Sequence, residues 1–332
     1  MSAEQTVGEI GEQGLLELVQ SFCSGDLVGD DAALLTIPPQ QSLVVSSDTL
    51  VDGIHFSDRT TPPHAAGWRA AAANLSDLAA MGAQPLALTI SLSLPREQSV
   101  AWVLELYRGL TACCQRYGAV VAGGDLSRSP TVAIAITALG SVTPAQALRR
   151  QTAQPGDAIV ATGWHGASRA GLELLLHPQA GQMLAAEARD RLICAHQYPR
   201  PRFDVLPYLE ALTLEHPPAA MDSSDGLADA VLQLCRTSGV GARLDGAALP
   251  MPPELASWLA SETALEWTLY GGEDFELVLC LPEGAARSLV AALGHGAAII
   301  GQITAGSEVT LSTPDGSSPE QTLTLTRGFQ HF

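Results

Sequence analysis

The stretch GDDAALLTIPPQQSLVVSSDTLVDGIHF, from Gly29 to Phe56, sets the interpretation of the whole sequence. Asp30 and Asp31 follow a glycine, and the apolar run 42–45 leads into three polar residues, Ser46, Ser47 and Asp48. This order predicts a turn, a buried strand and an acidic rim at the end of that strand. The stretch contains no lysine or arginine, so its crowded carboxylates need another counter-ion. A hard divalent metal ion suits their oxygen atoms.

Length and composition indicate a compact globular enzyme. The chain has 332 residues, which suggests two domains of roughly 150 residues each, and 46% of its residues are apolar. Its formal net charge is −18, from 35 acidic and 17 basic residues, which disfavours binding to nucleic acid or to an anionic membrane. No apolar run reaches the ~18 residues of a membrane-spanning helix, and the N-terminus lacks a signal-peptide pattern, so we expect a cytoplasmic protein.

All 17 basic residues are arginines. Without lysine the chain cannot supply a Walker-A lysine, a protein-kinase strand lysine or a Schiff base, which excludes several large enzyme classes. The six cysteines form no C-x-x-C pair and the eight histidines form no H-E-x-x-H pattern, so a zinc site is not expected.

Hydrophobic periodicity predicts helices and strands in both halves of the chain. Helices are expected at 7–22, 62–81, 99–118, 172–176, 200–214, 227–236 and 284–293. Further strands are expected at 86–94, 119–125, 131–141, 157–163, 219–222, 277–281 and 298–303. A polar tract from Arg149 to Gly156 indicates a boundary, which divides the chain into residues 1–150 and residues 151–332.

Three local patterns each allow two interpretations. Asn74 and Asp77 share one helix face, which suits either a solvated stripe or a ligand site framed by small residues. The G-x-x-G spacing of Gly163 and Gly166 favours a tightly packed strand-to-helix turn over a dinucleotide-binding fingerprint. Asp225 can cap the helix that follows it or act as a ligand, whereas its surroundings exclude a calcium loop.

Aspartates at expected turns or strand ends occur in both halves of the chain. Each is framed by Gly, Ser or Asn: Asp31, Asp48, Asp77, Asp125, Asp222 and Asp225. Magnesium uses one or two carboxylates and leaves its other positions to phosphate oxygens and water. Small neighbouring residues also let backbone N–H groups approach phosphates. The pattern favours magnesium ions shared with a polyphosphate, and therefore ATP chemistry without a P-loop.

Seven motifs, in this order, resemble the thiamine-monophosphate kinase family: GDDAA, SSDTLVDGIHF, NLSDLAAMGA, GGDLSR, PGD, DSSDGL and GGEDFEL. That family shares a superfamily with aminoimidazole ribonucleotide synthetase and selenophosphate synthetase. The resemblance implies an α/β (α+β) fold of two domains like that of aminoimidazole ribonucleotide synthetase. Residues 1–150 would bind ATP and magnesium and dimerise, and residues 151–332 would form a C-terminal α/β domain. In the expected homodimer, the N-terminal sheets pair into a shared barrel.

The resemblance also implies the reaction, which is ATP-dependent phosphorylation of thiamine monophosphate to thiamine diphosphate. ATP would be the co-substrate and several Mg²⁺ ions the cofactors, with no nucleic acid or membrane as partner. The acceptor is a phosphate oxygen that is already anionic, so the reaction needs no strong general base. Alignment and metal charge would carry catalysis.

Site residues follow from the resemblance position by position. The magnesium ligands that it implies are Asp31, Ser46, Ser47, Asp48, Asp77, Asp125, Asp222 and Asp225. Among them, the expected catalytic residues are Asp48, Asp125 and Asp222. The implied nucleotide contacts are Tyr107, Gly124, Asp125, Arg150 and Ser224, and the implied thiamine contacts are His55 and Glu273.

The sequence departs from the family pattern at two places. Residues 326–329 are Thr-Arg-Gly-Phe where the family tends to have an aromatic residue before Lys-Gly-Tyr, so Phe329 is the candidate for a substitute ring contact. Ser127 stands where threonine is commoner. Two alternatives stay open: another ATP-using enzyme of the superfamily, and a nucleotide-binding regulator without turnover. Cys23, beside an apolar helix, disfavours a selenophosphate synthetase.

Overall fold

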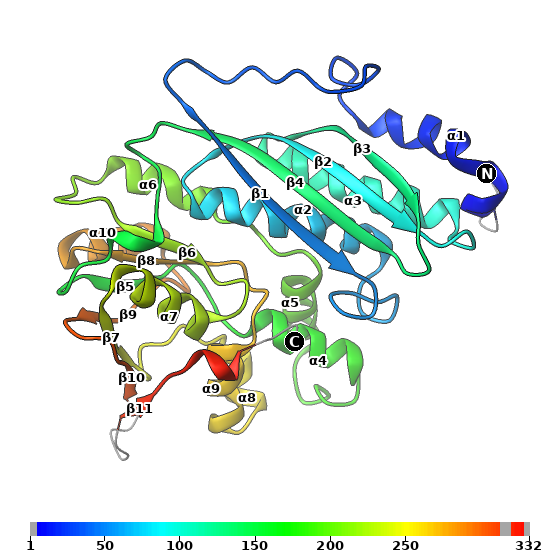
Figure 1. Ribbon diagram of the computed structural model, residues 1–332. Helices are drawn as coiled ribbons and strands as arrows, with labels where there is room; N and C mark the ends of the chain where they lie inside the picture. Colours follow the sequence, from blue (N-terminus) through cyan, green and yellow to red (C-terminus); the bar gives the residue numbers. More distant parts are fainter. Residues whose placement is uncertain (1–4, 313–319, 329–332) are drawn as a thin grey trace. The chain divides into compact units, whose positions relative to one another are not determined.

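The chain divides into two compact units, which Figure 1 shows as a ribbon. The structure is a computed structural model that describes residues 5–312 and 320–328. Unit 1 comprises Met1–Leu78 and Ala83–Ala145, and unit 2 comprises Ala79–Gly82 and Gln146–Phe332. The predicted division at residue 150, with the roles given to each half, stays a prediction.

Unit 1 is built on a mixed sheet. Its elements in chain order are α1 (Val7–Val19), η1 (Gln20–Phe22), β1 (Ser42–Val51), α2 (Pro63–Ala80), β2 (Gln84–Leu94), α3 (Val100–Tyr117), β3 (Val120–Arg128) and β4 (Ala133–Val142). Within the described part of the chain, the sheet has four strands in the order β1-β4-β2-β3. β1 and β2 are both antiparallel to β4, whereas β2 and β3 are parallel.

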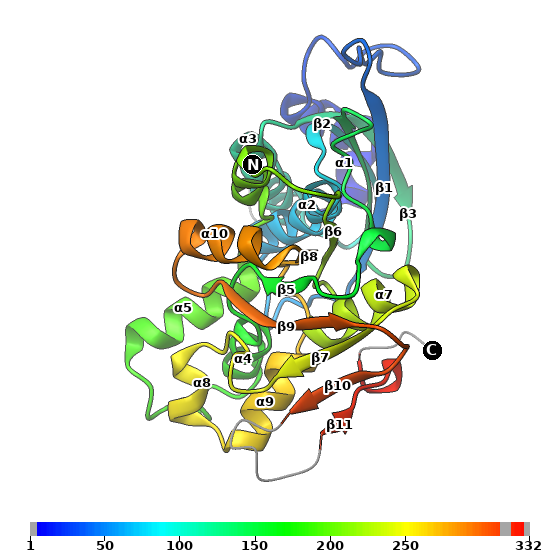
Figure 2. The ribbon, with the colours of Figure 1, turned by 90° about the vertical axis from the view of Figure 1, so that its left-hand side faces the viewer.

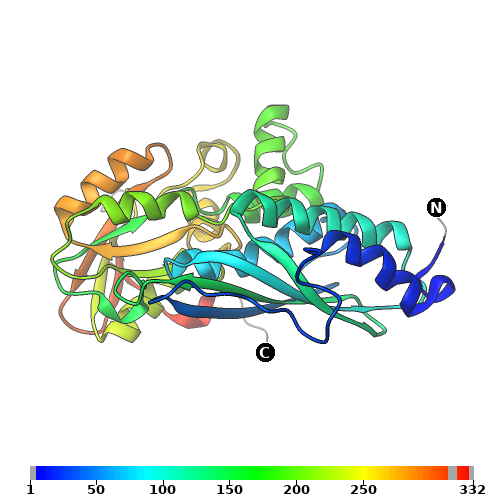
Figure 3. The same ribbon diagram turned by 90° about the horizontal axis from the view of Figure 1, so that it is seen from above.

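Helices α2 and α3 cover one face of this sheet, as Figures 1 and 3 show. α3 has clear ends, because Ser99 Oγ accepts the N–H of Trp102 at 3.2 Å and Gly118 adopts the left-handed conformation after the last turn. Alternate residues of β2 and β4 are buried, as the two-residue period of a strand requires: Leu88, Ile90, Leu92, Ile134, Ile136 and Ala138. These residues and the two helices form the core of unit 1.

β1 is not the buried strand that the sequence predicts. It lies at an edge of the sheet, and Leu43 and Val45 are 45% and 56% exposed. Its pairing with β4 continues through Asp48 to Val51, so Asp48 lies within the strand and not at its end. The apolar run misled the prediction because an edge strand can carry apolar side chains on an open face, and strand order is not visible in local sequence.

Unit 2 has a larger sheet and more helices. Its elements are η2 (Arg150–Thr152), β5 (Ala158–Ala161), α4 (Ala167–Leu176), α5 (Ala186–Gln197), η3 (Phe203–Val205), α6 (Leu206–Ala211), β6 (Ala219–Asp222), α7 (Leu227–Ser238), β7 (Gly241–Asp245), α8 (Pro253–Trp258), α9 (Ser261–Tyr270), β8 (Leu277–Leu281), α10 (Glu283–Leu293), β9 (Ala298–Thr304), β10 (Val309–Ser312), β11 (Gln321–Thr322) and η4 (Leu325–Arg327). Across the described residues, the strands form one sheet in the order β11-β10-β7-β9-β5-β8-β6. β7 and β10 are parallel, and the other neighbours are antiparallel.

Helices pack on both faces of the unit 2 sheet, and Figure 2 shows α7 and α10 on opposite sides of it. Ile159 and Ala161 of β5 join the core that contains α7, whereas Ala158 and Val160 join the core that contains α6 and α10. A strand covered on both faces has a continuous apolar sequence. That is why β5 and β8 were predictable from short apolar runs.

Most predicted helices and strands are confirmed, with ends that differ by a few residues. The helix expected at 200–214 is shorter, because it starts as η3 and α6 ends at Ala211. The sequence pattern did not predict α5, β7, α8 or α9. None of the helices that the structure describes has the length and apolar character needed to cross a membrane.

Candidate functional site

Four predicted site residues of unit 1 line one cavity of about 440 Å³: Asp31, Tyr107, Gly124 and Asp125. Asp30 lines the same cavity, so three carboxylates share it. The described residues around this cavity include neither arginine nor histidine. An anionic cavity without a cationic side chain fits a ligand that carries its own positive charge, such as a metal-bound nucleotide.

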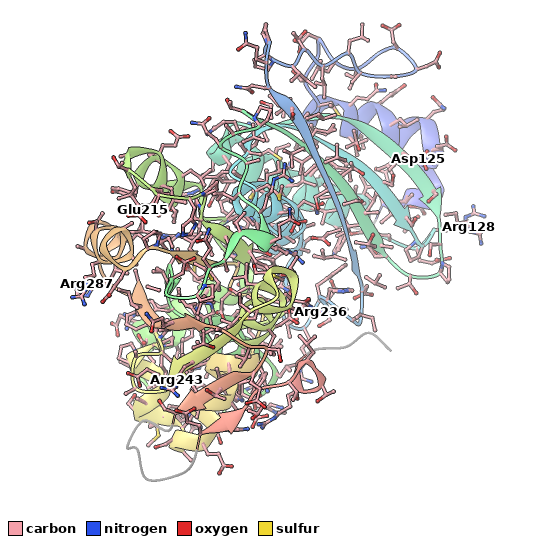
Figure 4. The ribbon with its side chains drawn as sticks, turned by 60° about the vertical axis from the view of Figure 1, so that its left-hand side comes forward. Asp125, Arg128, Glu215, Arg236, Arg243 and Arg287 are labelled. Carbon is pink, nitrogen blue, oxygen red and sulfur yellow. The ribbon has the colours of Figure 1, made fainter. Side chains whose placement is uncertain are left out.

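Gly124 lets β3 approach β2 closely beside this cavity. A Cβ at Gly124 would lie 1.9 Å from the carbonyl oxygen of Ile90, so a larger residue does not fit. The next pair along the ladder joins Ser91 to Asp125, and pairing continues to Arg128. Asp125 therefore lies inside β3, with Arg128 further along the strand (Figure 4), and the prediction that it ends a strand is wrong.

Tyr107 contributes a buried ring to the cavity. Its side chain is 4% exposed, and its ring centroid lies 5.6 Å from that of Phe22. Burial raises the pKa of the Tyr107 phenol, and the nearby Cys23 thiol raises it further. The phenol is therefore neutral at physiological pH, which suits contact with an uncharged part of a ligand.

Three further predicted ligands meet between β1 and α2. Ser46 Oγ donates a hydrogen bond to a carboxylate oxygen of Asp77. The Asp48 N–H donates to Oδ1 of Asn74 at 3.0 Å. Ser46 and Asp48 are two residues apart in a strand, so both lie on the α2 side of β1. The structure therefore brings together Ser46, Asp48 and Asp77.

Asn74, expected with Asp77 on either a solvated stripe or a ligand site, does not lie on a solvated stripe. It is fully buried, and its Nδ2 donates to the carbonyl oxygen of Ala70 at 2.9 Å. Its amide therefore joins α2 to β1 at Asp48. A signal was present, because an amide surrounded by alanines on a buried helix must find hydrogen-bond partners.

Ser47 lies on the opposite face of β1 from Ser46. Its Oγ donates to the carbonyl oxygen of Ile136 at 3.0 Å and accepts a bond from Thr137 Oγ1 at 3.4 Å. The structure thus separates this hydroxyl from the pair formed by Ser46 and Asp77. Its role as a metal ligand stays a prediction.

His55 closes the turn that follows β1. Its Nδ1 accepts the N–H of Val51 at 3.0 Å, and Arg69 Nη2 donates to its carbonyl oxygen at 3.2 Å. A neutral imidazole that accepts at Nδ1 carries its hydrogen on Nε2. The contact of His55 with thiamine stays a prediction.

In unit 2, Asp222, Ser224 and Asp225 belong to one turn between β6 and α7. Asp222 is the last residue of β6 and is buried, whereas Asp225 is exposed. Ser224 Oγ donates to Oδ1 of Asp222 at 3.5 Å. Gly226, and not Asp225, occupies the N-cap position of α7, so the capping interpretation of Asp225 is not supported.

The charge of Arg150 affects Asp229, in the first turn of α7. Burial raises the pKa of Asp229, the charge of Asp225 raises it further, and the charge of Arg150 opposes this rise. The Arg150 carbonyl oxygen accepts a bond from Ser238 Oγ at 2.9 Å. These effects place Arg150 and Asp225 in one electrostatic neighbourhood around Asp229.

Glu273 lies in a strained loop that is bonded to the 222–225 turn. Its N–H donates to the carbonyl oxygen of Ser224 at 2.7 Å, and its φ of 57° is uncommon for a residue with a side chain. Its Oε2 lies 3.9 Å from Nδ1 of the buried His196. The structure therefore brings a predicted nucleotide contact, Ser224, next to a predicted thiamine contact. Phe329, the candidate ring contact, lies outside the described residues.

The donor atoms of these sites fit magnesium. They are carboxylate and hydroxyl oxygens, and the unit 1 cavity offers them no competing cationic side chain in its described lining. In the described ranges, no three acidic, histidine or cysteine side chains stand close enough to hold a metal ion by themselves. Phosphate oxygens and water would therefore complete the coordination of an ion, as is usual for magnesium with nucleotides.

Comparison with known proteins gives matches over nearly the whole chain. Residues 29–142 match the model of the AIR synthase related protein, N-terminal domain, and residues 154–313 match that of the C-terminal domain. A curated thiamine-monophosphate kinase of Synechococcus elongatus is 52% identical over 99% of both chains. The crystal structure of thiamine-monophosphate kinase from Stenotrophomonas maltophilia K279a has a TM-score of 0.78 and 34% identity, and the match covers 90% of this chain and 95% of that one. The complex of AaThiL with AMPPCP and TMP has a TM-score of 0.75 and 30% identity over 100% of both chains.

The fold and the two domain models define a two-domain α/β protein of the AIR synthase related class. Within this class, the chain belongs to the thiamine-monophosphate kinase family. The resemblance drawn from the seven sequence motifs is thereby confirmed, and so is the prediction of a phosphotransferase. The expected barrel between two N-terminal sheets stays a prediction.

Proposed function

We propose that the protein transfers the γ-phosphoryl group of ATP to thiamine monophosphate and releases thiamine diphosphate and ADP, a step of thiamine diphosphate biosynthesis. The observation that carries this proposal is the 52% identity, over 99% of both chains, with a curated thiamine-monophosphate kinase. The AMPPCP and TMP bound to the similar AaThiL support the same pair of ligands.

The roles of residues in unit 1 follow from the geometry of that unit. Gly124 lets β3 pack closely on β2 at the cavity wall, Tyr107 offers a neutral ring, and Asp31 and Asp125 bring negative charge to the same cavity. Magnesium held by the predicted aspartates would neutralise charge on the phosphates. In this proposal His55, at the turn after β1, contacts the thiamine ester.

Unit 2 supplies a second set of groups in this proposal. Asp222 and Asp225 supply the carboxylates that bind magnesium. Ser224 and Arg150 contact the nucleotide, and Glu273 holds the thiamine substrate. The hydrogen bond from Glu273 N–H to Ser224 carbonyl oxygen supports this grouping, because it fixes the two sets of contacts relative to each other.

The transfer is direct. A phosphate oxygen of thiamine monophosphate attacks the γ-phosphorus, the bond from that phosphorus to the bridging oxygen of ADP breaks, and the electron pair leaves on ADP. The attacking oxygen is already ionised, so no side chain has to remove a proton from it. Alignment of the two phosphates is then the main task of the protein.

We also infer that the active form is a homodimer. Leu43 and Val45 lie two residues apart on one face of the edge strand β1, and both are about half exposed. A second copy of the same sheet is the partner that matches this face, because an exposed apolar face can pair with its own copy about a twofold axis.

The direct test is to incubate the purified protein with Mg²⁺, ATP and thiamine monophosphate and to separate the thiamine esters by chromatography. We expect equal amounts of thiamine diphosphate and ADP, and loss of both products when the magnesium is chelated. Release of ADP without thiamine diphosphate would contradict the proposal that thiamine monophosphate is the phosphoryl acceptor. ATP binding without any ADP would favour the regulator alternative.

A further inference from the structure

A cluster of buried polar groups lies beneath the 222–225 turn, and none of the proposed ligand roles uses it. Ser223 sits between Asp222 and Ser224 and is 1% exposed. Its Oγ lies 3.0 Å from Nε2 of His165, whose side chain is 0% exposed. Nδ1 of His165 lies 3.0 Å from the carbonyl oxygen of Gly163.

The direction of these hydrogen bonds follows from chemistry. A carbonyl oxygen has no hydrogen, so Nδ1 of His165 must donate to Gly163. Burial lowers the pKa of His165 to about 4, so the ring is neutral near pH 7 and Nε2 is an acceptor. The Ser223 hydroxyl is therefore the donor to Nε2. The carbonyl oxygen of Glu276, at 3.2 Å, is the other acceptor within its reach.

Ser223 also joins the turn to the loop that carries Glu273. The Ser223 N–H donates to the Glu276 carbonyl oxygen at 2.9 Å, and the Glu273 N–H donates to the Ser224 carbonyl oxygen at 2.7 Å. Glu273 and Phe275 both have positive φ, 57° and 52°. Such conformations are strained for residues with a side chain and persist only where neighbouring contacts hold them.

The far end of this loop is held as well. Thr162 Oγ1 donates to Oε2 of Glu276 at 2.7 Å, and Arg202 Nη1 bonds the same oxygen. Thr162 Oγ1 also accepts the N–H of Leu277 at 2.9 Å. The loop is thus fixed at Glu276, and Ser223 is the point at which the turn meets this fixed end.

We propose that His165 and Ser223 are positioning residues that hold the 222–225 turn in register with the Glu273 loop. The turn carries the groups assigned to the nucleotide and magnesium, and the loop carries the group assigned to thiamine, so the pair sets their separation. This inference rests on the proposed function for its effect on turnover. Its structural part, the coupling of turn and loop, stands on the hydrogen bonds alone.

The test uses three variants of the full-length protein. Ser223→Ala removes the hydroxyl, His165→Leu removes the acceptor, and His165→Gln keeps an amide oxygen in place of Nε2. Thr268→Val is the matched control, because it removes a hydroxyl that is also 1% exposed and that donates to the Ala264 carbonyl oxygen inside α9. Hydrogen–deuterium exchange of the ligand-free proteins and steady-state kinetics are the two readouts.

We expect exchange in the 271–276 segment of Ser223→Ala to be at least ~10-fold faster than in the control, since bonds around a loosened loop open more often. We expect kcat to fall by at least ~10-fold, with the KM for ATP within about threefold of wild type. His165→Gln should recover at least ~5-fold more kcat than His165→Leu if the hydrogen bond is what matters.

The outcomes separate the two claims. If the wild type makes no thiamine diphosphate, the proposed function fails, and the exchange result still decides the coupling of turn and loop. If the wild type is active and Ser223→Ala behaves like Thr268→Val in both readouts, the positioning role is overturned. Should Ser223→Ala fail to fold, equal kcat of His165→Gln and His165→Leu would overturn it instead.

Discussion

Asp48 is held through its backbone by a buried amide on another element. Its N–H donates to Asn74 on α2, and its strand partner on β4 is Ile136. The neighbouring Ser46 is tied to Asp77 on the same helix. At this scale the sequence motif predicted Ser46, Asp48 and Asp77 as site residues, and their role as ligands stays a prediction. The motif could not show that a buried amide on another element binds the backbone of Asp48.

Asp48→Asn keeps the backbone bond and the size of the side chain and removes the charge. We expect turnover to fall by ~100-fold or more, because a neutral amide cannot balance the positive charge of a magnesium ion. The midpoint of urea unfolding should change little. Asp52→Asn, four residues further on and also exposed, is the control and should keep its turnover. Turnover near that of the wild type in Asp48→Asn would remove Asp48 from the site.

His165 makes stability depend on pH. The ordinary pKa of a histidine is about 6.5, and burial lowers that of His165 to about 4, so the unfolded chain takes up this proton first as the pH falls. The contribution to the free energy of unfolding is complete above pH 6.5 and declines by up to ~3 kcal/mol toward pH 4. His165→Gln lacks this decline, which urea unfolding of both proteins at pH 7 and pH 5 would measure.

Comparing the pH dependence of stability in the wild type and in His165→Gln separates the effect of His165 from that of other groups. Burial raises the pKa of Asp274 to about 7, and this effect has the opposite sign, since its contribution is lost as the pH rises toward 7. Asp274 is present in both proteins, so its effect cancels in the difference. An equal loss of stability at pH 5 in both proteins would contradict the assignment to His165.

At the scale of elements, hydrophobic periodicity predicted whether a segment is a helix or a strand better than it predicted the burial of that segment. β5 was found from its sequence AIVA because helices cover both of its faces. β1 was also found, but its burial was predicted wrongly, since it is an edge strand with an open face. The predicted end of β3 at Asp125 is too early, since its pairing with β2 continues to Arg128. Local pattern gives the face of a side chain, whereas strand order comes from distant residues.

The contact between α2 and β1 gives a prediction at this scale. Asn74→Ala removes the acceptor of the Asp48 N–H, and the partly buried donor is then left without that bond. We expect the free energy of unfolding to fall by ~1–3 kcal/mol despite the good helix propensity of alanine. Chemical denaturation measures this, with Ser76→Ala on the same helix as a second variant for comparison. A stability equal to that of the wild type would show that the bond does not join the two elements.

At the scale of the whole molecule, the acidic residues of each unit were predicted as members of one site from family motifs. Neighbours in sequence, such as 222–225, were predictable as a cluster. The bond between Ser224 and Glu273 was not, because it depends on how β6, α7 and the loop before β8 fold around one another. The roles of the two halves and the oligomeric state stay proposals.

The inferred dimer gives a prediction on the open face of β1. Val45→Asp places a charge where the second copy would bury it, so we expect the dissociation constant of the dimer to rise by ~100-fold or more. Met183→Asp is the control, because Met183 is 74% exposed and lies in unit 2. Sedimentation equilibrium would measure both variants. A wild type that stays monomeric, or equal dissociation constants for both variants, would contradict the inferred dimer.

The central claim is that the γ-phosphoryl group of ATP is transferred to thiamine monophosphate and not to water. The most direct measurement uses ATP carrying ¹⁸O on the non-bridging γ oxygens and follows the products by ³¹P nuclear magnetic resonance. We predict that all of the label appears on the terminal phosphorus of thiamine diphosphate and none in inorganic phosphate. Label in inorganic phosphate, with thiamine monophosphate unchanged, would contradict the claim and show that the protein only hydrolyses ATP.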